Sequence, residues 1–460
     1  MRHETASFIK SALEKTILHL ALILVFFPPL FLVPRVFTHD VTLHTKLLFT
    51  GFVSSLAAGL CIVRIMLFSD RISFKDTPVR LAVIIYGISI IISCILSEQP
   101  LYSLRESLRI IPFLLIFIFF PRNILTRDAV KIRITALLAG FLTAFYGLCQ
   151  YFDYNFLLRW FPFIPRYDTA RSQIVSTMGN PEYLGSYLSP LVILCIPAFL
   201  KKSRPAIQII YAMLIAILLF TILLTGSRGP VIGMAAGGLF AAIFIFRKAP
   251  YKVRKRITVT CSILFLIMLI FIVIFSFPNR LNPRGQNISG RFVSLFDIRS
   301  ESIKERIMFY VIGSEMISDN PVFGSGEGMF RVKFYPTLNR LLEKDDRAGV
   351  RMFIKELKNR VADNSHNDFL QIWIENGIIG FLAFTLAIFM FLGRSIFYLK
   401  NKSDISKNHG CEVLAYSSAL LCVLVNATFS FPLHMPARSA LFWVLFSVSC
   451  SMILTTRPNK

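Results

Sequence analysis

The feature that most constrains this chain is a series of apolar runs, each about twenty residues long. A run of this length crosses the hydrocarbon core of a bilayer as an α-helix. Of the 460 residues, 45 are phenylalanine, and 55% of the sequence is hydrophobic. We therefore expect an all-α integral membrane protein with about twelve transmembrane helices, at about 16–34, 46–67, 80–96, 106–121, 132–152, 184–200, 206–225, 229–246, 257–276, 372–396, 411–431 and 438–455.

The net charge of +24 is distributed as in a multi-pass membrane protein. With the N-terminus placed in the cytoplasm, the seven inside segments hold 26 Lys and Arg residues and the five short outside loops hold 9. Cytoplasmic loops are enriched in basic residues in this way, so no nucleic-acid partner is needed to explain the charge. The pattern predicts that both termini are cytoplasmic.

One long outside segment differs from the short loops. From about 278 to 367 it carries 15 basic and 11 acidic residues, close to the balance of a folded soluble insert. Apolar residues at helical spacing predict amphipathic helices on the membrane face or over a cavity, first at Ile303, Ile307, Val311 and Ile312, then at Val350, Phe353, Ile354, Leu357 and Val361. We expect three parts: 1–276 with spans one to nine and an outside loop at about 153–183, the large helical insert at 277–367, and 368–460 with spans ten to twelve.

Several classes of site are disfavoured by what the sequence lacks. The eight cysteines lie in or beside apolar runs without a Cys-x-x-Cys pair, so no disulfide framework or cysteine metal site is predicted. The outside loops contain no Asp-x-Asp pair or cluster of His and Asp, which predicts no metal and no cofactor. Apart from Glu375, ionisable residues are almost absent from the span interiors, whereas ion-coupled transporters carry charged groups near the midplane.

The stretch 364–380 places a histidine at the mouth of the tenth predicted span. It begins with a polar cluster and passes directly into an apolar run. An imidazole titrates near neutral pH, so His366 at such a boundary could take a proton from a sugar hydroxyl. The alternative is a polar helix cap, because Asn and Asp favour helix starts for that reason alone.

Two outside arginines are candidates for binding phosphate. Arg228 is the only basic residue of the turn 225–230, and its planar fork suits bidentate contact with a phosphate. Its alternative role is that of an arginine reaching lipid headgroups. Arg306 lies on a predicted helix of the insert, where it could equally be a solvated arginine paired with Glu305 or Glu301.

Together these motifs resemble the O-antigen ligase and polymerase superfamily of bacterial envelope glycosyltransferases. The resemblance covers about 80–455, and its blocks occur in the family's order: Gly179-Asn180-Pro181, Thr225–Gly229, Arg306 with Asp319–Gly324, His366–Leu370, Glu375-Asn376-Gly377 and Gly380. One departure is Phe309-Tyr310, where the family pattern would have a tryptophan.

The resemblance implies a GT-C-like fold and a glycosyltransferase of the bacterial inner membrane with its active site facing the periplasm. Members pass a glycan from undecaprenyl diphosphate to an acceptor and need neither a nucleotide sugar nor a metal. It implies His366 as the general base and Arg228 and Arg306 as the residues that bind the diphosphate. Residues that could support them are Asn364, Asn367, Asp368, Glu375, Asn180 and Tyr183.

Two activities fit the resemblance. A ligase transfers the glycan to the lipid A-core oligosaccharide, and we favour this activity. A polymerase transfers it to another lipid-linked glycan and is the nearest alternative. A flippase or transporter of lipid-linked sugars is more remote, because no internal repeat is found and the span interiors carry almost no charge.

Overall fold

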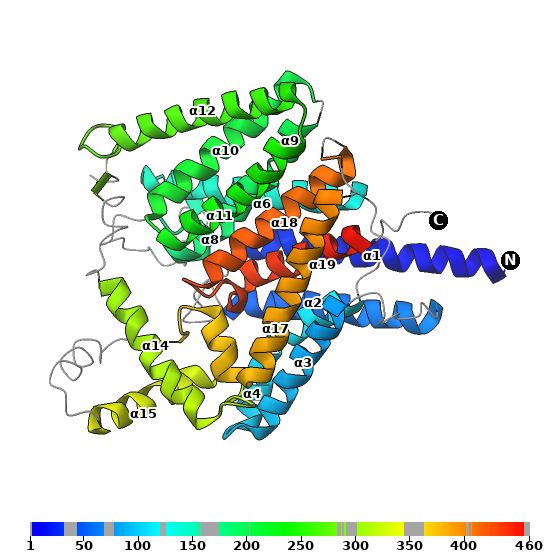
Figure 1. Ribbon diagram of the computed structural model, residues 1–460, viewed down its shortest axis with the longest axis vertical. Helices are drawn as coiled ribbons and strands as arrows, with labels where there is room; N and C mark the ends of the chain where they lie inside the picture. The colour runs from blue at the N-terminus through cyan, green and yellow to red at the C-terminus, as the bar shows by residue number, and fades with distance from the viewer. Residues whose placement is uncertain are drawn as a thin grey trace.

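The chain forms a bundle of α-helices (Figure 1). The computed structural model describes residues 2–31, 44–68, 78–119, 126–154, 156–157, 174–201, 203–282, 287, 289–290, 301–344, 363–401, 404–405 and 407–454. In chain order the elements are α1 (Arg2–Leu30), α2 (His44–Phe68), α3 (Pro78–Leu96), α4 (Pro100–Ser107), α5 (Ile111–Phe119), α6 (Thr126–Tyr151), η2 (Ser176–Met178), α8 (Pro181–Leu194), α9 (Pro197–Leu200), α10 (Pro205–Thr225), α11 (Arg228–Lys248), α12 (Tyr251–Ile274), α14 (Glu301–Asp319), α15 (Met329–Lys344), α17 (Asp368–Asn401), α18 (Asn408–Ala427), η3 (Pro432–His434) and α19 (Pro436–Leu454). The all-α, multi-pass fold predicted from the apolar runs is confirmed.

Eleven of the described helices are long and apolar enough to cross a membrane, and they correspond to eleven of the twelve predicted spans. The exception is the fourth, at 106–121, which was expected to be one helix. It is divided between α4 and α5, with a turn at residues 108–110. Pro112 is the second residue of α5, where proline fits a helix start but cannot continue an earlier helix. Arg109 pairs with Glu106 across the turn at 2.7 Å.

Between α4 and α6 the chain nevertheless crosses from one face of the bundle to the opposite face. On one face, the start of α4 lies against the loop after α14, where a side chain at Gly326 would meet Ser103. On the other face, Thr126 Oγ1 at the start of α6 lies 2.9 Å from His409 Nδ1 at the start of α18. The later helices therefore keep the alternating directions that twelve crossings would give them. We call the face that carries both termini the termini face and the opposite one, with α14 and α15, the loop face (Figure 1).

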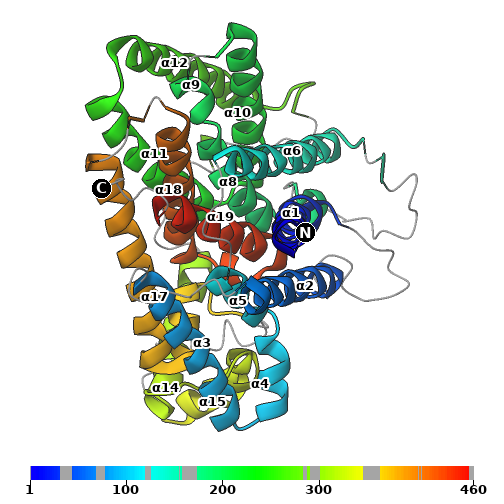
Figure 2. The same cartoon turned by 90° about the vertical axis from the view of Figure 1, so that its right-hand side faces the viewer.

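α8, α18 and α19 form the centre of the bundle. The buried share of their apolar stretch is 83%, 89% and 94%, against 6% for α12, which lies at the outer edge (Figures 1 and 2). A stripe of small residues joins α11 to α18, because Cβ atoms added at Gly229, Gly233 and Gly237 would come within 2.5 Å of atoms of α18. Small residues at every fourth position let two helix backbones approach closely. This packing fixes the position of Arg228, the first residue of α11.

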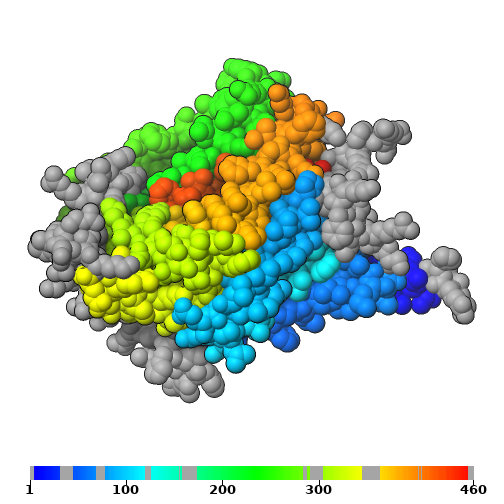
Figure 3. Space-filling view, turned by 60° about the horizontal axis from the view of Figure 1, so that its bottom comes forward, coloured from blue at the N-terminus to red at the C-terminus, as the bar shows by residue number. Residues whose placement is uncertain are grey.

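The described part of the predicted insert contains α14 and α15, which lie beside α3 and α4 (Figure 3). They share a small core that also includes a residue of α17: Met308, Phe309, Ile312, Met316, Phe330, Phe334, Leu338 and Ile374. The predicted stripe on α14 is only partly right, since Ile312 is buried but Ile307 and Val311 are exposed. The stripe predicted at 350–361 and most of the outside loop at 153–183 fall outside the described residues.

α17 is kinked at Gly377, whose backbone has φ 65° and ψ −173°. Next to the kink, the carbonyl oxygens of Ile374 and Glu375 accept hydrogen bonds from the backbone N–H groups of Ser325 and Gly326, at 3.0 and 2.9 Å. The loop after α14 is thereby fixed against the N-terminal part of α17.

This loop, residues 320–328, has positive φ at Gly324, Gly326 and Gly328. Positive φ is readily adopted only by glycine, so the sequence Gly-Ser-Gly-Glu-Gly suits a tight path. The loop passes between α17 and α4, and this path brings Glu327 to the wall of a cavity.

Candidate functional site

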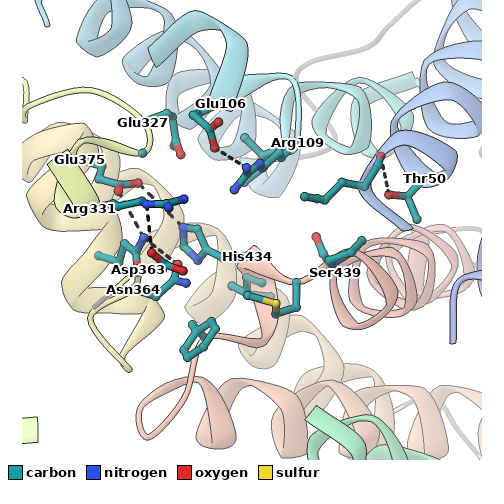
Figure 4. Close-up of a pocket in the computed structure, with 18 of the residues that line it drawn as sticks. Thr50, Glu106, Arg109, Glu327, Arg331, Asp363, Asn364, Glu375, His434 and Ser439 are labelled. Carbon is teal, nitrogen blue, oxygen red and sulfur yellow. Dashed lines mark hydrogen bonds and ion pairs between the residues drawn. The ribbon is translucent and has the colours of Figure 1, made fainter. Parts of the chain in front are cut away.

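A polar cavity of about 480 Å³ lies at the loop face (Figure 4). Residues from α2, α4, α8, α17, α19, η3, the loop 320–328 and the segment 363–366 line it. Glu106, Glu327 and Glu375 lie on one side, and Thr50 and Ser439 lie on the other. The cavity is therefore assembled from parts of the chain that are distant in sequence.

His366 lines this cavity from the turn that precedes α17. Its backbone has φ 53°, an uncommon conformation for a residue with a side chain. Its ring stacks on Phe309 of α14, with the centroids 5.4 Å apart and the planes at 5°, and meets Phe431 edge to face at 4.8 Å. Phe309 belongs to the pair of residues at which the sequence departs from the family pattern. Two aromatic side chains therefore set the direction of the imidazole.

The surroundings of His366 favour its neutral form. Burial lowers the pKa of His366 from its usual value, and the charges of Arg306 and Arg438 lower it further, against the opposing effect of Glu182. A neutral imidazole has a lone pair that can accept a proton. His366 can therefore accept a proton from a group in the cavity.

The neighbours expected to orient His366 have other partners. Asn367 caps α17, accepting from the N–H groups of Phe369 and Leu370 at 2.9 and 3.1 Å. Asn364 accepts from the side chain of Gln371 at 3.1 Å. The helix-cap interpretation therefore holds for Asn367, and it does not conflict with a chemical role for the histidine beside it.

Asp368 is bound to a different histidine. Its Oδ1 lies 2.5 Å from Nδ1 of His434, and its Oδ2 accepts from the N–H of Leu433 at 2.8 Å. Among the described residues, neither Asn364, Asn367 nor Asp368 is hydrogen-bonded to the His366 ring. The ring of His366 is oriented instead by its contacts with Phe309 and Phe431.

Of the two predicted arginines, Arg306 lies near His366. It is half-buried on α14, close enough for its charge to lower the pKa of the histidine. Sequence reasoning missed a second arginine there, Arg438 in the first turn of α19. Its buried guanidinium stacks on the ring of Tyr183 at 4.4 Å and donates to Ser186 Oγ at 2.8 Å. Its place at the start of a predicted span was the signal that could have identified it.

Arg228 lies at the other side of α8. A side chain at Gly185 would meet Pro230 at 3.0 Å and Thr225 at 3.1 Å, so the Arg228 turn packs against the second turn of α8. Asn180 caps this helix by accepting from the N–H of Glu182 at 2.8 Å. Asn180, Glu182 and Tyr183 line the cavity, whereas Arg228 is not among the described residues that do.

A second group of ionisable residues was also missed. Glu327, Glu375 and His434 line the cavity, and their side-chain ligand atoms all lie within 4.8 Å of one another. Burial alone would lower the pKa of His434, but Asp368, with Glu375 and Glu327, raises it to about 9. His434 is therefore an imidazolium ion at neutral pH. Because these residues come from three distant segments, no local pattern in the sequence marks the group.

The same three residues are the group with metal-ligand spacing in the described part of the chain. At neutral pH His434 is protonated because of the nearby carboxylates, and a divalent cation bound there would have to displace that proton. The spacing alone therefore does not identify a metal site.

The charge of His434 makes stability depend on pH. A histidine whose pKa is raised by folding stabilises the folded state fully below pH 6.5, and this contribution is lost as the pH rises through about 9. The shift corresponds to roughly 3 kcal/mol. Between pH 6.5 and 9.5 the wild-type protein should lose more of its free energy of unfolding than His434→Gln, as measured by thermal unfolding in detergent. His409→Gln, on the termini face, should follow the wild-type profile; equal slopes for His434→Gln and wild type would contradict the assignment.

The family model described as O-antigen ligase matches residues 213–385, which include Arg228, Arg306, His366 and the Gly377 kink. No curated protein matches the sequence. The match supports the O-antigen ligase and polymerase superfamily, and with it a glycosyltransferase-like membrane enzyme that acts on lipid-linked glycan in general.

Proposed function

We propose that this chain, whose residues 213–385 match the O-antigen ligase family, transfers a glycan from undecaprenyl diphosphate to the lipid A-core oligosaccharide. In this proposal His366 is the general base, and Arg228 and Arg306 bind the diphosphate. The reaction takes place on the periplasmic side of the bacterial inner membrane, so the loop face is periplasmic and both termini are cytoplasmic. The three parts 1–276, 277–367 and 368–460 are the first membrane part, the periplasmic insert and the last membrane part.

The observation that carries the proposal is the setting of His366. A neutral imidazole opens onto a polar cavity at the loop face, and arginines lie behind it. A general base must reach a substrate hydroxyl and must be unprotonated at the working pH, and the cavity beside His366 and its lowered pKa support this role. A flippase would not need such a base.

The chemical step follows from this arrangement. His366 takes the proton of an acceptor hydroxyl as its oxygen bonds to the anomeric carbon of the donor sugar. The bond from that carbon to the phosphate oxygen breaks, and the lipid diphosphate leaves with the bonding electrons. The developing charge is stabilised by Arg228 and Arg306, each charge-assisted hydrogen bond contributing about 1.5–3 kcal/mol.

The polyprenyl tail has a candidate site of its own. An apolar groove of about 710 Å³ lies between α8, α9, α10, α11 and α12, and none of the described residues that line it is charged. α11 borders this groove and begins with Arg228 at the loop face. A lipid tail along α11 would place its diphosphate towards that arginine.

The experiment that tests the function is transfer by purified protein in the presence of EDTA. A lipid-linked glycan is offered with lipid A-core in one reaction and with a second lipid-linked glycan in another. Transfer to lipid A-core establishes the ligase, and extension of the second glycan establishes the polymerase. Activity that disappears in EDTA and returns with magnesium would contradict a reaction that relies on arginines alone.

Arg228→Lys should weaken donor binding about 10–100-fold. Lysine keeps the positive charge but loses the planar fork that makes two parallel hydrogen bonds to a phosphate. Binding of undecaprenyl diphosphate to purified protein measures the effect. The control is Arg247→Lys, in the last turn of the same helix on the termini face, which should bind like wild type. Unchanged donor affinity in Arg228→Lys would remove Arg228 from the site.

A further inference from the structure

The two arginines that line the cavity, Arg109 and Arg331, are each paired with a carboxylate of its wall. Arg306 and Arg438 act on His366, and neither is among the described residues that line the cavity. The carboxylates of Glu327 and Glu375 lie on the cavity wall and act on His434. The space in front of His434 is therefore unsuited to a phosphate, although it adjoins the proposed base.

This acidic group carries more negative than positive charge. Two other carboxylates on the wall are each paired with an arginine at 3.0 Å or less. Glu182, also on the wall, acts on His366. Glu327 and Glu375 remain, and together with Asp368 behind the wall they act on His434. Buried carboxylates are stable when hydrogen-bond donors satisfy their oxygens. The group therefore requires further donors.

Glu375 shows where a donor is missing. The residue is 1% exposed, and its Oε1 accepts from the N–H of Phe330 at 3.4 Å and from Nε2 of Gln371 at 3.2 Å. Its Oε2 has no hydrogen-bond partner in the described part of the chain. Nε2 of His434 is 4.0 Å away, too far for a hydrogen bond. Glu375 therefore has a buried oxygen without a partner, and His434 has an N–H without a close acceptor. Both residues line the same cavity wall.

We propose that Glu327, Glu375 and His434 form a subsite for an uncharged sugar ring, whose hydroxyls hydrogen-bond to the carboxyl groups of Glu327 and Glu375 and accept from Nε2 of His434. The inference rests on the proposed function, in which this ring belongs to the acceptor. A hydroxyl both donates and accepts, so adjacent hydroxyls of one ring satisfy both kinds of group. Tyr102 and Phe431 add aromatic surface to the same cavity, and about 480 Å³ is within the range of small-molecule sites.

The charges determine which substrate occupies the subsite. A direct displacement at a sugar carbon needs the attacking hydroxyl and the leaving phosphate on opposite sides. In the proposed function the leaving phosphate is bound by Arg228 and Arg306. The acceptor sugar therefore occupies the side of the cavity that carries Glu327 and Glu375. A sugar that itself carries a carboxylate would meet the carboxylate of Glu327 with little intervening water, and like charges in such a site oppose binding strongly.

The test is sugar binding by saturation-transfer NMR, with the full-length protein in detergent and EDTA at pH 7. The probes are three pairs that differ in charge: glucose and glucuronate, galactose and galacturonate, mannose and mannuronate. At least one neutral sugar should bind about tenfold more tightly than its uronate partner. Glu327→Gln should reduce that difference to less than about threefold. Glutamine keeps an oxygen for the bond from Asn376 Nδ2, now at 2.9 Å, so the fold is preserved.

The control is Glu98→Gln, because Glu98 is an exposed carboxylate on the loop face that pairs with Lys333 outside the cavity lining. It should leave the neutral-to-uronate ratio unchanged. The proposal is overturned if the uronates bind as tightly as the neutral sugars, if no neutral sugar binds, or if Glu327→Gln leaves the ratio as it was. A transfer assay on the same preparation separates the two proposals. Charge-selective binding without transfer would refute the function but keep the sugar subsite, and transfer without such binding would do the reverse.

Discussion

His366→Ala should lower the rate of glycan transfer by about 10²–10⁴-fold, the usual contribution of a general base. Donor binding should survive, because the arginines assigned to the diphosphate come from α11 and α14. Because the pKa of His366 is lowered by burial and by nearby arginines, the wild-type rate should stay high down to pH 6.5 and fall only below it. The measurement is single-turnover transfer by purified protein, with donor binding determined separately.

The matched control is His409→Gln. His409 also has a lowered pKa, but it joins Thr126 and the carbonyl of Met452 on the termini face, away from the cavity. In cells, loss of a ligase should leave full-length polymer on its lipid carrier, whereas loss of a polymerase should leave single repeat units. A wild-type transfer rate in His366→Ala would end the general-base proposal.

Gly377→Ala should destabilise the protein by at least about 3 kcal/mol and abolish transfer. A Cβ atom at this position would lie 2.1 Å from the carbonyl oxygen of Val322 and 2.6 Å from the backbone nitrogen of Gly324. Neither backbone atom can move without displacing the loop 320–328, and the backbone conformation itself suits only glycine. Release of the loop would remove Glu327 from the cavity wall.

Thermal unfolding in detergent measures this effect, and Gly393→Ala in the same helix is its control. Gly393 has no atom within 4 Å of an added Cβ, so alanine there should be neutral or should stabilise α17 by up to about 1 kcal/mol. If the two variants unfolded alike, the tight contact between the kink and the loop would not exist in the folded protein.

Hydropathy predicted the spans well because crossing a bilayer is a local property of about twenty consecutive residues. It failed at 106–121, where the average is apolar enough but a turn and Pro112 divide the helix. The stripe on α14 failed for a related reason. Helical spacing shows that residues share a face, but only packing against α17 decides that Met308 and Met316 are buried while Ile307 is exposed.

For the site, sequence patterns predicted His366, Arg228 and Arg306 as candidates, because each belongs to a short motif with its own chemistry. The residues that set their surroundings come from separate segments: Phe309 stacks on the imidazole, and Arg438 adds positive charge. The sequence by itself determined a bundle of membrane helices with a histidine at the loop face. Only the tertiary structure decided that this histidine is neutral and that Asp368 belongs to His434, because burial and charge depend on what surrounds a group in space rather than on its neighbours in the chain.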